Sequence, residues 1–221
     1  LYRYNSITGA YESKPMNVKG GNMWKFGVNY DQGIGVYFRL MNKFKVLTSK
    51  SYGFLTIVDN NDPNAVPDLN LQKRLGIDEN FELSYEAEKV QLTLFNDLQW
   101  NRYRYDDDTY NSSPLYNSLG MSVTLKFSPF EMYIRLSDDF RKGYATSEMN
   151  GHKLMSMASI SYGFCKNKCR LSLFVDDIFN NDIWYDNNYS AFQRTETTTN
   201  YMHHYANLKF SYRFDAKAKK K

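Results

Sequence analysis

The stretch "YANLKFSYRF", residues 205–214, alternates apolar and polar residues from end to end. Successive side chains of a β-strand point to opposite faces, so this pattern predicts a strand with one apolar and one polar face. The apolar face holds Ala206, Leu208, Phe210, Tyr212 and Phe214. In a soluble β-protein such a face is the core, whereas in an outer-membrane β-barrel it meets lipid. The stretch fits both readings, and the rest of the chain has to decide between them.

The same period of two recurs along the chain, with almost no convincing amphipathic helix. Clear examples are "MWKFGVNY" (23–30), "VYFRLMNKFKV" (36–46), "KVQLTLFNDLQW" (89–100), "GMSVTLKF" (120–127), "ASISYGF" (158–164) and "RLSLFVDD" (170–177). The segment from Glu88 to Tyr105 has no breaker and exceeds the ~5–6 residues of a typical soluble strand. We therefore predict an all-β protein of about ten strands, from a partial one at Tyr2–Thr8 to a last one at Tyr201–Phe214.

The expected connections alternate in length. Short turns are predicted near Gln32–Gly35, Glu86–Lys89, Ser128–Pro129 and Lys166–Lys168, and longer polar loops at about 10–20, 59–70, 106–114, 141–152 and 180–200. An antiparallel meander gives this rhythm when one rim has tight turns and the other has long loops. Outer-membrane barrels have short periplasmic turns and longer extracellular loops. Strand length and loop rhythm together favour the membrane reading.

Composition agrees with a β-rich chain. The 221 residues suffice for one sizeable domain or part of a larger one, and aromatic residues reach 17%. No run of ~20 apolar residues, as a transmembrane helix requires, is present. The net charge of +4 is partly due to Lys217, Lys219, Lys220 and Lys221, in a tail (215–221) that we expect to be disordered. Basic and acidic residues alternate elsewhere, which argues against nucleic-acid binding.

The two cysteines, Cys165 and Cys169, flank "KNK", which reads as a tight turn. A hairpin disulfide, which would imply an oxidising compartment, and a pair of free thiols both remain open. No second cysteine pair is present to complete a zinc site.

No catalytic residue, metal site or cofactor is expected, and the chain does not read as an enzyme. His203 and His204 are adjacent on a predicted strand and therefore face opposite ways, which is poor metal-binding geometry. His152 reads as a solvated loop residue. The acidic run Asp106–Asp108 fits a weak cation site, but a solvated loop is the favoured interpretation. Binding through loops is favoured over catalysis.

Four stretches carry a resemblance to a known family. They are "FELSYEAEKVQLTLFNDLQWNRYRY" (81–105), "RLSDDFRKGYATSEMNGHKLMSMASISYGF" (135–164), "RLSLFVDDIFNND" (170–182) and "YANLKFSYRF". Their order and spacing resemble the C-terminal part of a TonB-dependent receptor barrel of the kind found in Bacteroidetes, in the outer membrane protein β-barrel family. The resemblance extends from about Asn22 to Phe214.

This resemblance implies that residues 1–214 are the C-terminal portion of an antiparallel transmembrane β-barrel of about 22 strands. A plug and the other barrel half would then lie before Leu1. It implies uptake of a scarce nutrient, such as a metal chelate, glycan or peptide, driven by a TonB-type energy coupler acting through the plug. The expected location is the outer membrane, in contact with its lipid, with long loops extracellular and short turns and C-terminus periplasmic. Further implied partners are the barrel-assembly machinery, which would read Phe210, Tyr212 and Phe214, and a surface lipoprotein.

Two sets of residues are candidates for solute contact. Aromatic residues in the last long loop would either bind ligand or pack against neighbouring loops: Trp184, Tyr185, Tyr189 and Phe192. Charged residues of the polar face would line the lumen or contact the plug: Arg39, Lys43, Glu82, Glu131, Arg135, Lys209 and Arg213. Two alternatives stay open. One is a passive or structural outer-membrane barrel, porin- or adhesin-like, closed by these strands alone. The other is a soluble β-barrel with its aromatic face inside, around an apolar ligand.

Overall fold

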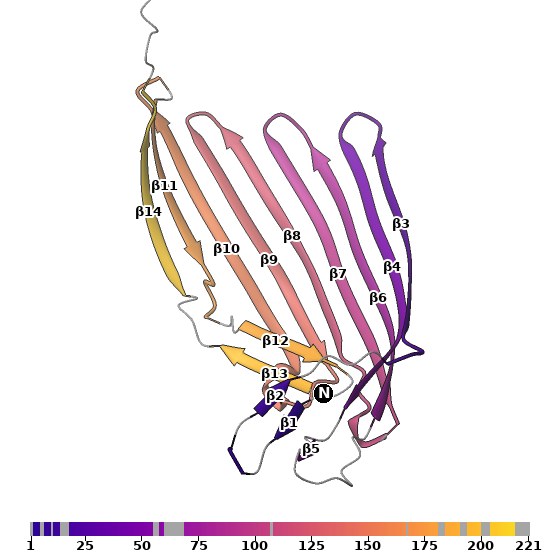
Figure 1. Cartoon of the computed structure of the whole chain (residues 1–221). Coiled ribbons are helices and arrows are strands. Elements are labelled where there is room, and N and C mark those ends of the chain that lie inside the picture. The colour runs from indigo at the N-terminus through magenta and orange to yellow at the C-terminus, as the bar shows by residue number, and fades with distance from the viewer. Residues whose placement is uncertain are drawn as a thin grey trace, which may run out of the picture.

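The computed structural model describes residues 2–4, 7–9, 11–13, 18–54, 58–59, 69–106, 108–166, 168–180, 184–190, 194–199 and 204–214. Its main element is a nine-stranded sheet in the order β3-β4-β6-β7-β8-β9-β10-β11-β14 (Figure 1). The strands are β3 (Asn22–Ile34), β4 (Phe38–Phe54), β6 (Leu69–Glu86), β7 (Val90–Tyr105), β8 (Leu115–Phe127), β9 (Phe130–Lys142), β10 (Gly151–Phe164), β11 (Cys169–Asp176) and β14 (Tyr205–Tyr212). All neighbours pair antiparallel in chain order, so the predicted meander is confirmed.

Smaller elements accompany the sheet. Strands β1 (Tyr2–Tyr4), β2 (Tyr11–Ser13) and β5 (Val58–Asp59) form a three-stranded sheet, β12 (Trp184–Tyr189) and β13 (Arg194–Thr199) form a hairpin, and η1 (Asp108–Tyr110) and η2 (Ser147–Met149) are single 3₁₀ turns. The prediction of a first meander strand at Tyr2–Thr8 is wrong. Extended backbone ends at Tyr4 and pairs with β2 and β5, and Ile7–Thr8 form a turn before Gly9, whose φ is 70°.

Connection length alternates as predicted. The strand ends joined by short connections, at 35–37, 87–89, 128–129 and 165–168, lie along one edge of the sheet, and those joined by longer connections, at 55–68, 106–114, 143–150 and 177–204, lie along the other (Figure 1). We refer to these as the short-turn edge and the long-loop edge. Strands β4, β6 and β7 contain 17, 18 and 16 residues, well above the ~5–6 of typical strands.

The strand register keeps apolar residues in common rows. One row joins Phe26, Val46, Ile77, Trp100 and Leu115 across five strands. Another joins Leu125, Met132, Ile160, Leu173 and Leu208 from β8 across the remaining four strands. A slip of one residue in any strand would move its apolar set to the other face. Every strand keeps the parity, so the predicted division into an apolar and a polar face holds across the sheet.

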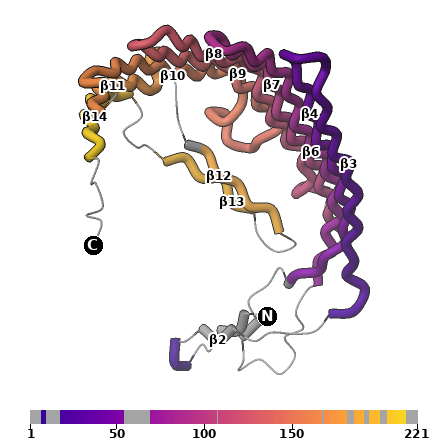
Figure 2. Tube along the Cα trace, turned by 90° about the horizontal axis from the view of Figure 1, so that it is seen from above, coloured from indigo at the N-terminus to yellow at the C-terminus, as the bar shows by residue number. Residues whose placement is uncertain are grey.

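The sheet is curved, and its apolar face is the convex one. Viewed from above, the nine strands form an arc with the β12–β13 hairpin inside it (Figure 2). The hairpin contacts Tyr103 and Lys153, which belong to the polar face. The polar face is therefore concave. The soluble alternative required the aromatic face to line the interior, and this curvature is the reverse of that requirement.

The arc is not closed into a barrel. Strands β3 and β14 lie at its two ends, and the outer edge of each has no partner strand in the described parts of the chain (Figure 2). Unpaired sheet edges leave backbone N–H and C=O groups available for a further strand.

The two cysteines are free thiols in this structure. The ladder places Phe164, not Cys165, opposite Cys169. Cys165 lies in the turn with a φ of 53° and is exposed, whereas Cys169 begins β11 and is buried. No disulfide joins them in this structure, and the hairpin disulfide stays a prediction.

Candidate functional site

The β12–β13 hairpin occupies the segment for which the sequence predicts only a long polar loop. Pairing of Tyr185 with Thr198, and of Tyr189 with Arg194, sets these residues on one face of the hairpin together with Glu196. That face meets the concave side of the main sheet near its long-loop edge (Figures 1 and 2). The threonine-rich strand β13 has no apolar alternation, and its position depends on the contacts of this one face.

Glu196 is the centre of those contacts. Its Oε1 accepts hydrogen bonds from the Tyr189 hydroxyl at 2.6 Å and from Arg194 Nη2 at 2.6 Å. The backbone N–H groups of Ala145 and Thr146 donate to Oε1 and Oε2 at 3.2 and 2.8 Å. The Glu196 side chain is only 5% exposed. We call these five residues the Glu196 cluster, and it fixes the hairpin to the β9–β10 connection.

The cluster holds Glu196 ionised. Burial alone would raise the pKa of this carboxyl, but hydrogen bonds from Tyr189, Arg194 and the two backbone N–H groups favour the charged form and lower the pKa to about 2. Burial, followed by the hydrogen bond to Glu196, raises the pKa of Tyr189. Charge-assisted hydrogen bonds of this kind are stronger than neutral ones. The ionised Glu196 carboxylate therefore holds the hairpin against the β9–β10 connection.

Aromatic contacts extend the attachment. The Tyr189 ring stacks on Tyr103 of β7, with centroids 4.6 Å apart. The Tyr185 hydroxyl accepts a hydrogen bond from Lys153 Nζ at 2.5 Å and donates one to the Glu148 carbonyl oxygen at 2.7 Å. The Arg141 guanidinium lies 4.8 Å from the centre of the Tyr185 ring. Both tyrosines are therefore occupied by protein contacts.

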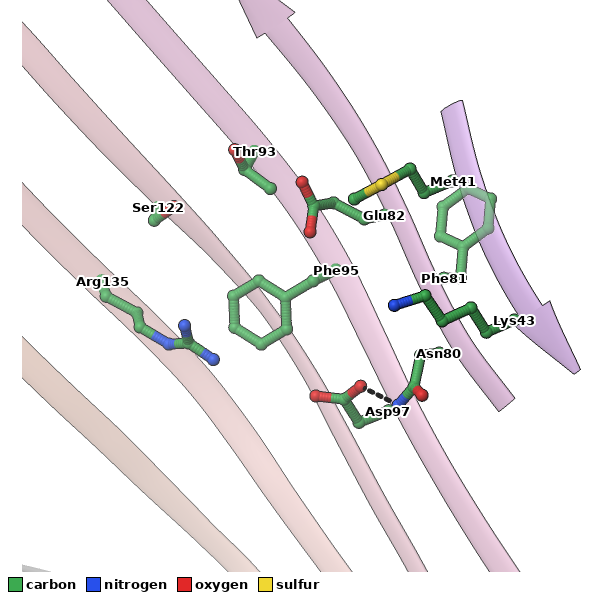
Figure 3. Close-up of a pocket in the computed structure, with 10 residues that line it drawn as sticks. All are labelled: Met41, Lys43, Asn80, Phe81, Glu82, Thr93, Phe95, Asp97, Ser122 and Arg135. Atoms are coloured by element: carbon green, nitrogen blue, oxygen red, sulfur yellow. Dashed lines mark hydrogen bonds between the residues drawn. The ribbon is translucent and has the colours of Figure 1, made fainter. Parts of the chain in front are cut away.

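Toward the short-turn edge, the concave face carries a groove of about 390 Å³ (Figure 3). Lys43, Glu82, Asp97 and Arg135 bring charges of both signs to its wall. The Arg135 guanidinium covers the Phe95 ring at 4.1 Å, and Asn80 Nδ2 donates to Asp97 Oδ1 at 2.6 Å. A groove with fixed charges of both signs is suited to a polar or zwitterionic chain rather than to an apolar ligand.

A second groove of about 310 Å³ continues from the first and shares Asp97 and Arg135 with it. Its wall is more acidic, with Asp139, Asp176 and Asp177. Asp139 is buried, and its carboxylate accepts hydrogen bonds from Ser118 Oγ at 2.6 Å and from the Tyr116 hydroxyl at 3.0 Å. The two grooves form one continuous polar track on the concave face.

The structure places six of the seven charged residues predicted for the polar face at concave strand positions. Lys43, Glu82 and Arg135 line the first groove, and Arg39, Glu131 and Lys209 share their concave parity. Arg39 forms a salt bridge with Asp31, Glu131 forms one with Arg170, and Arg213 directly follows β14. Contact of these residues with a solute or a plug stays a prediction.

Those of the other predicted site residues whose side chains are described lie apart from the grooves. Tyr185 and Tyr189 lie in the hairpin contacts already described. The side chains of Trp184 and Phe192, with His203, Asp107 and the tail 215–221, fall outside the described residues. Phe210 and Tyr212 are convex-face residues of β14, opposite Leu171 and Cys169, and Phe214 is 83% exposed. Their recognition by the assembly machinery stays a prediction.

Sequence reasoning missed the pairing of Glu196 with Arg194 in the Glu196 cluster, and it missed the packing of Tyr103 against the hairpin. Glu196 stands alone among threonines in "RTETTT", and no local pattern links it to Tyr103, which lies on another strand far along the chain. The alternation of Tyr185 and Tyr189 was the available signal, since it predicts one face of a strand.

Comparison with known proteins leaves the chain without a family: no protein-family model, curated protein or solved structure matches it. Across the described residues, no helix has the length and apolar character to cross a membrane. Nor do three or more His, Cys, Asp or Glu side chains in those residues converge on a point where a metal ion would bind.

Proposed function

We propose that this chain is part of the wall of an outer-membrane β-barrel, of the receptor and transporter type that takes up a scarce solute. The observation that carries the proposal is the convex face. It is apolar across nine strands, yet Leu119, in the middle of the sheet, is 60% exposed, and Phe26 and Phe210 near its ends are 65% and 61% exposed. Soluble monomers rarely expose contiguous apolar patches beyond a few hundred Å².

The height of the apolar face matches a bilayer. Convex positions are largely apolar from Ile34 to Trp24, from Tyr85 to Leu75 and from Val90 to Trp100, and the next convex positions toward the long-loop edge are Asn22, Lys73 and Arg102. A membrane strand needs ~9–11 tilted residues to cross the hydrocarbon. The polar concave face with its grooves would then line a wet interior, as in known barrels.

Two pairs of polar residues on the convex face hydrogen-bond with each other. Asn42 Nδ2 donates to Glu79 Oε1 at 2.8 Å, and Asn96 Nδ2 donates to Asn117 Oδ1 at 2.9 Å. Pairing reduces the cost of removing polar groups from water. The free outer edges of β3 and β14 supply the places where further strands would complete the wall.

The experiment that tests membrane insertion uses the 221-residue chain itself. It is refolded in detergent and mixed with phosphatidylcholine vesicles, and flotation with resistance to carbonate extraction is measured. We expect the chain to float and to show heat-modifiable gel mobility. A chain that remains monomeric and soluble without detergent would overturn the proposal.

A passive barrel is the second candidate function, and the hairpin is the observation that favours it. A hairpin fixed inside the arc narrows the passage, as a pore constriction does. The two candidates differ in energy dependence. In cells that express the complete coding region, uptake by a receptor should stop when a protonophore is added, and vesicles should show no swelling in sugar solutions. A passive barrel gives protonophore-insensitive uptake and rapid swelling.

A further inference from the structure

Four basic side chains gather on the convex face at the long-loop edge. Lys50 of β4 lies directly opposite Lys73 of β6, and Lys73 lies directly opposite Arg104 of β7. Arg102 occupies the next convex position of β7, opposite Leu75. All four side chains are exposed. We call Lys50, Lys73, Arg102 and Arg104 the cationic patch.

Within the residues that the structure describes, most of this charge is uncompensated. Like charges directly opposite one another destabilise a sheet, and Lys50, Lys73 and Arg104 are three in a row. In the described parts of the chain, no salt bridge or side-chain hydrogen bond involves any of the four. The adjacent carboxylate on this face is Asp106, whose Oδ2 accepts a hydrogen bond from the Leu71 N–H at 3.2 Å. Among the described residues, Asp106 is therefore the one carboxylate next to the four cations on this face.

The patch adjoins the apolar band of the convex face. Toward the short-turn edge, Thr48 and Leu75 share a row with Arg102, and the next convex row is Val46, Ile77 and Trp100, beyond which the face is largely apolar. The indole N–H of Trp100 donates to Ser113 Oγ at 3.0 Å, so this ring has one polar and one apolar side. Indole rings favour the headgroup level of a bilayer. In a membrane the cationic patch would stand one or two rows above that level.

The opposite edge is different. There the corresponding convex positions hold Phe38 and Tyr85, whose rings lie 5.2 Å apart, in place of charges. The convex face therefore distinguishes its two ends, with aromatic rings at the short-turn edge and cations at the long-loop edge. A bound protein, or packing against other copies of this chain, would not require an apolar band next to the cations. A lipid would require one, because its acyl chains lie directly beside its charged headgroup.

We propose that the cationic patch binds the phosphate groups of an anionic lipid headgroup in the leaflet beside the long-loop edge. This inference rests on the proposed function, because it needs the convex face to meet lipid. Guanidinium groups bind phosphate oxygens in bidentate fashion, and lysines add point charges. Each Lys or Arg near an anionic membrane surface strengthens binding by about fivefold. The lipid's acyl chains lie against Ile77, Trp100 and their neighbours.

The test compares two variants of equal net charge. The patch variant carries Lys73→Gln, Arg102→Gln and Arg104→Gln, and the control carries Lys89→Gln, Lys126→Gln and Lys166→Gln near the short-turn edge. Each full chain is inserted into phosphatidylcholine nanodiscs, and binding of a fluorescent bis-phosphorylated glycolipid and of its dephosphorylated form is titrated. We expect the patch variant to lose at least tenfold in affinity for the phosphorylated form and the control to match the unaltered chain.

Each other outcome overturns a defined part of the inference. Equal affinity of the unaltered chain for the two glycolipids would show that the phosphate groups, and therefore the patch, do not contribute to lipid binding. Displacement of the glycolipid by micromolar inorganic phosphate would make free phosphate the ligand. A change of oligomeric state in the patch variant, with unchanged lipid affinity, would assign the patch to a second copy. Failure of every variant to enter nanodiscs would instead overturn the proposed function itself.

Discussion

Tyr189 of the hairpin stacks on Tyr103 of the main sheet, with ring centroids 4.6 Å apart and planes inclined by 16°. The Tyr103 side chain is 5% exposed, so the hairpin covers it almost completely. The same Tyr189 donates its hydroxyl proton to Glu196 at 2.6 Å. One residue thus joins the aromatic and the charged parts of the attachment, and substitutions can separate them.

The first prediction separates the stack from the hydrogen bond. In a double-mutant cycle, Tyr103→Leu and Tyr189→Leu should couple by about 0.5–1.5 kcal/mol, which is the range for aromatic pairs beyond area burial. The readout is the free energy of hairpin opening from hydrogen exchange in residues 185–198. Tyr103→Leu combined with Tyr185→Leu is the control, because Tyr185 contacts Lys153 and Arg141 instead. Coupling of similar size in that pair would show that the stack is not the cause.

The second prediction follows from the pKa of Glu196, which is lowered from 4.5 to about 2. A carboxyl with a lowered pKa contributes stability that is complete above its unfolded value and is lost as pH falls through the folded value. Hairpin opening, followed by exchange of the Ala145 and Thr146 amides and corrected for intrinsic rates, should therefore increase between pH 4.5 and about 2. Glu196→Gln should open more readily at pH 7 and lose this dependence.

Glu148→Gln is the control for that series. The Glu148 carboxylate is exposed, and only its backbone carbonyl meets the hairpin. This variant should follow the unaltered chain at every pH. If it loses the acid-induced opening as Glu196→Gln does, the titrating group is not Glu196.

The third prediction concerns the concave groove. A Cβ added to Gly120 would lie 2.4 Å from the Phe95 ring and 2.5 Å from the Leu136 carbonyl oxygen. Because the second of these is backbone, the sheet itself must shift, and we expect Gly120→Ala to reduce the free energy of unfolding by about 1–3 kcal/mol. Gly33→Ala, where nothing lies within 4 Å, should cost much less. Denaturant titration in detergent measures both, and equal values would contradict this account of Gly120.

The sequence predicts most of the main sheet because its strands repeat a period of two over a long span. Phe26, Val46 and Trp100 of one row lie in stretches whose alternation was predicted, whereas Ile77 and Leu115 lie where β6 and β8 extend beyond the predicted stretches. The direction in which the main sheet curves could not be predicted in this way. Apolar and polar faces alternate equally in a strand that bends either way, so only the placement of Tyr103 and Lys153 against the hairpin identifies the concave side.

The hairpin and the cationic patch escaped prediction for a common physical reason. Glu196 and Ala145 are far apart in the chain, and so are Lys50, Lys73 and Arg104. Their proximity depends on register, which a single strand does not specify.

The fourth prediction tests which face meets lipid. Met121 and Thr124 lie on the same strand, β8, and on opposite faces, since Met121 pairs with Leu94 and Leu136 whereas Thr124 pairs with Gln91 and Tyr133. An arginine facing the bilayer midplane destabilises a membrane strand by about 2–4 kcal/mol, whereas one facing a wet interior does not. We therefore expect Met121→Arg to lower the free energy of unfolding in phosphatidylcholine vesicles by that amount and Thr124→Arg to have little effect. Equal costs for the two variants in vesicles would mean that the convex face of β8 does not meet lipid.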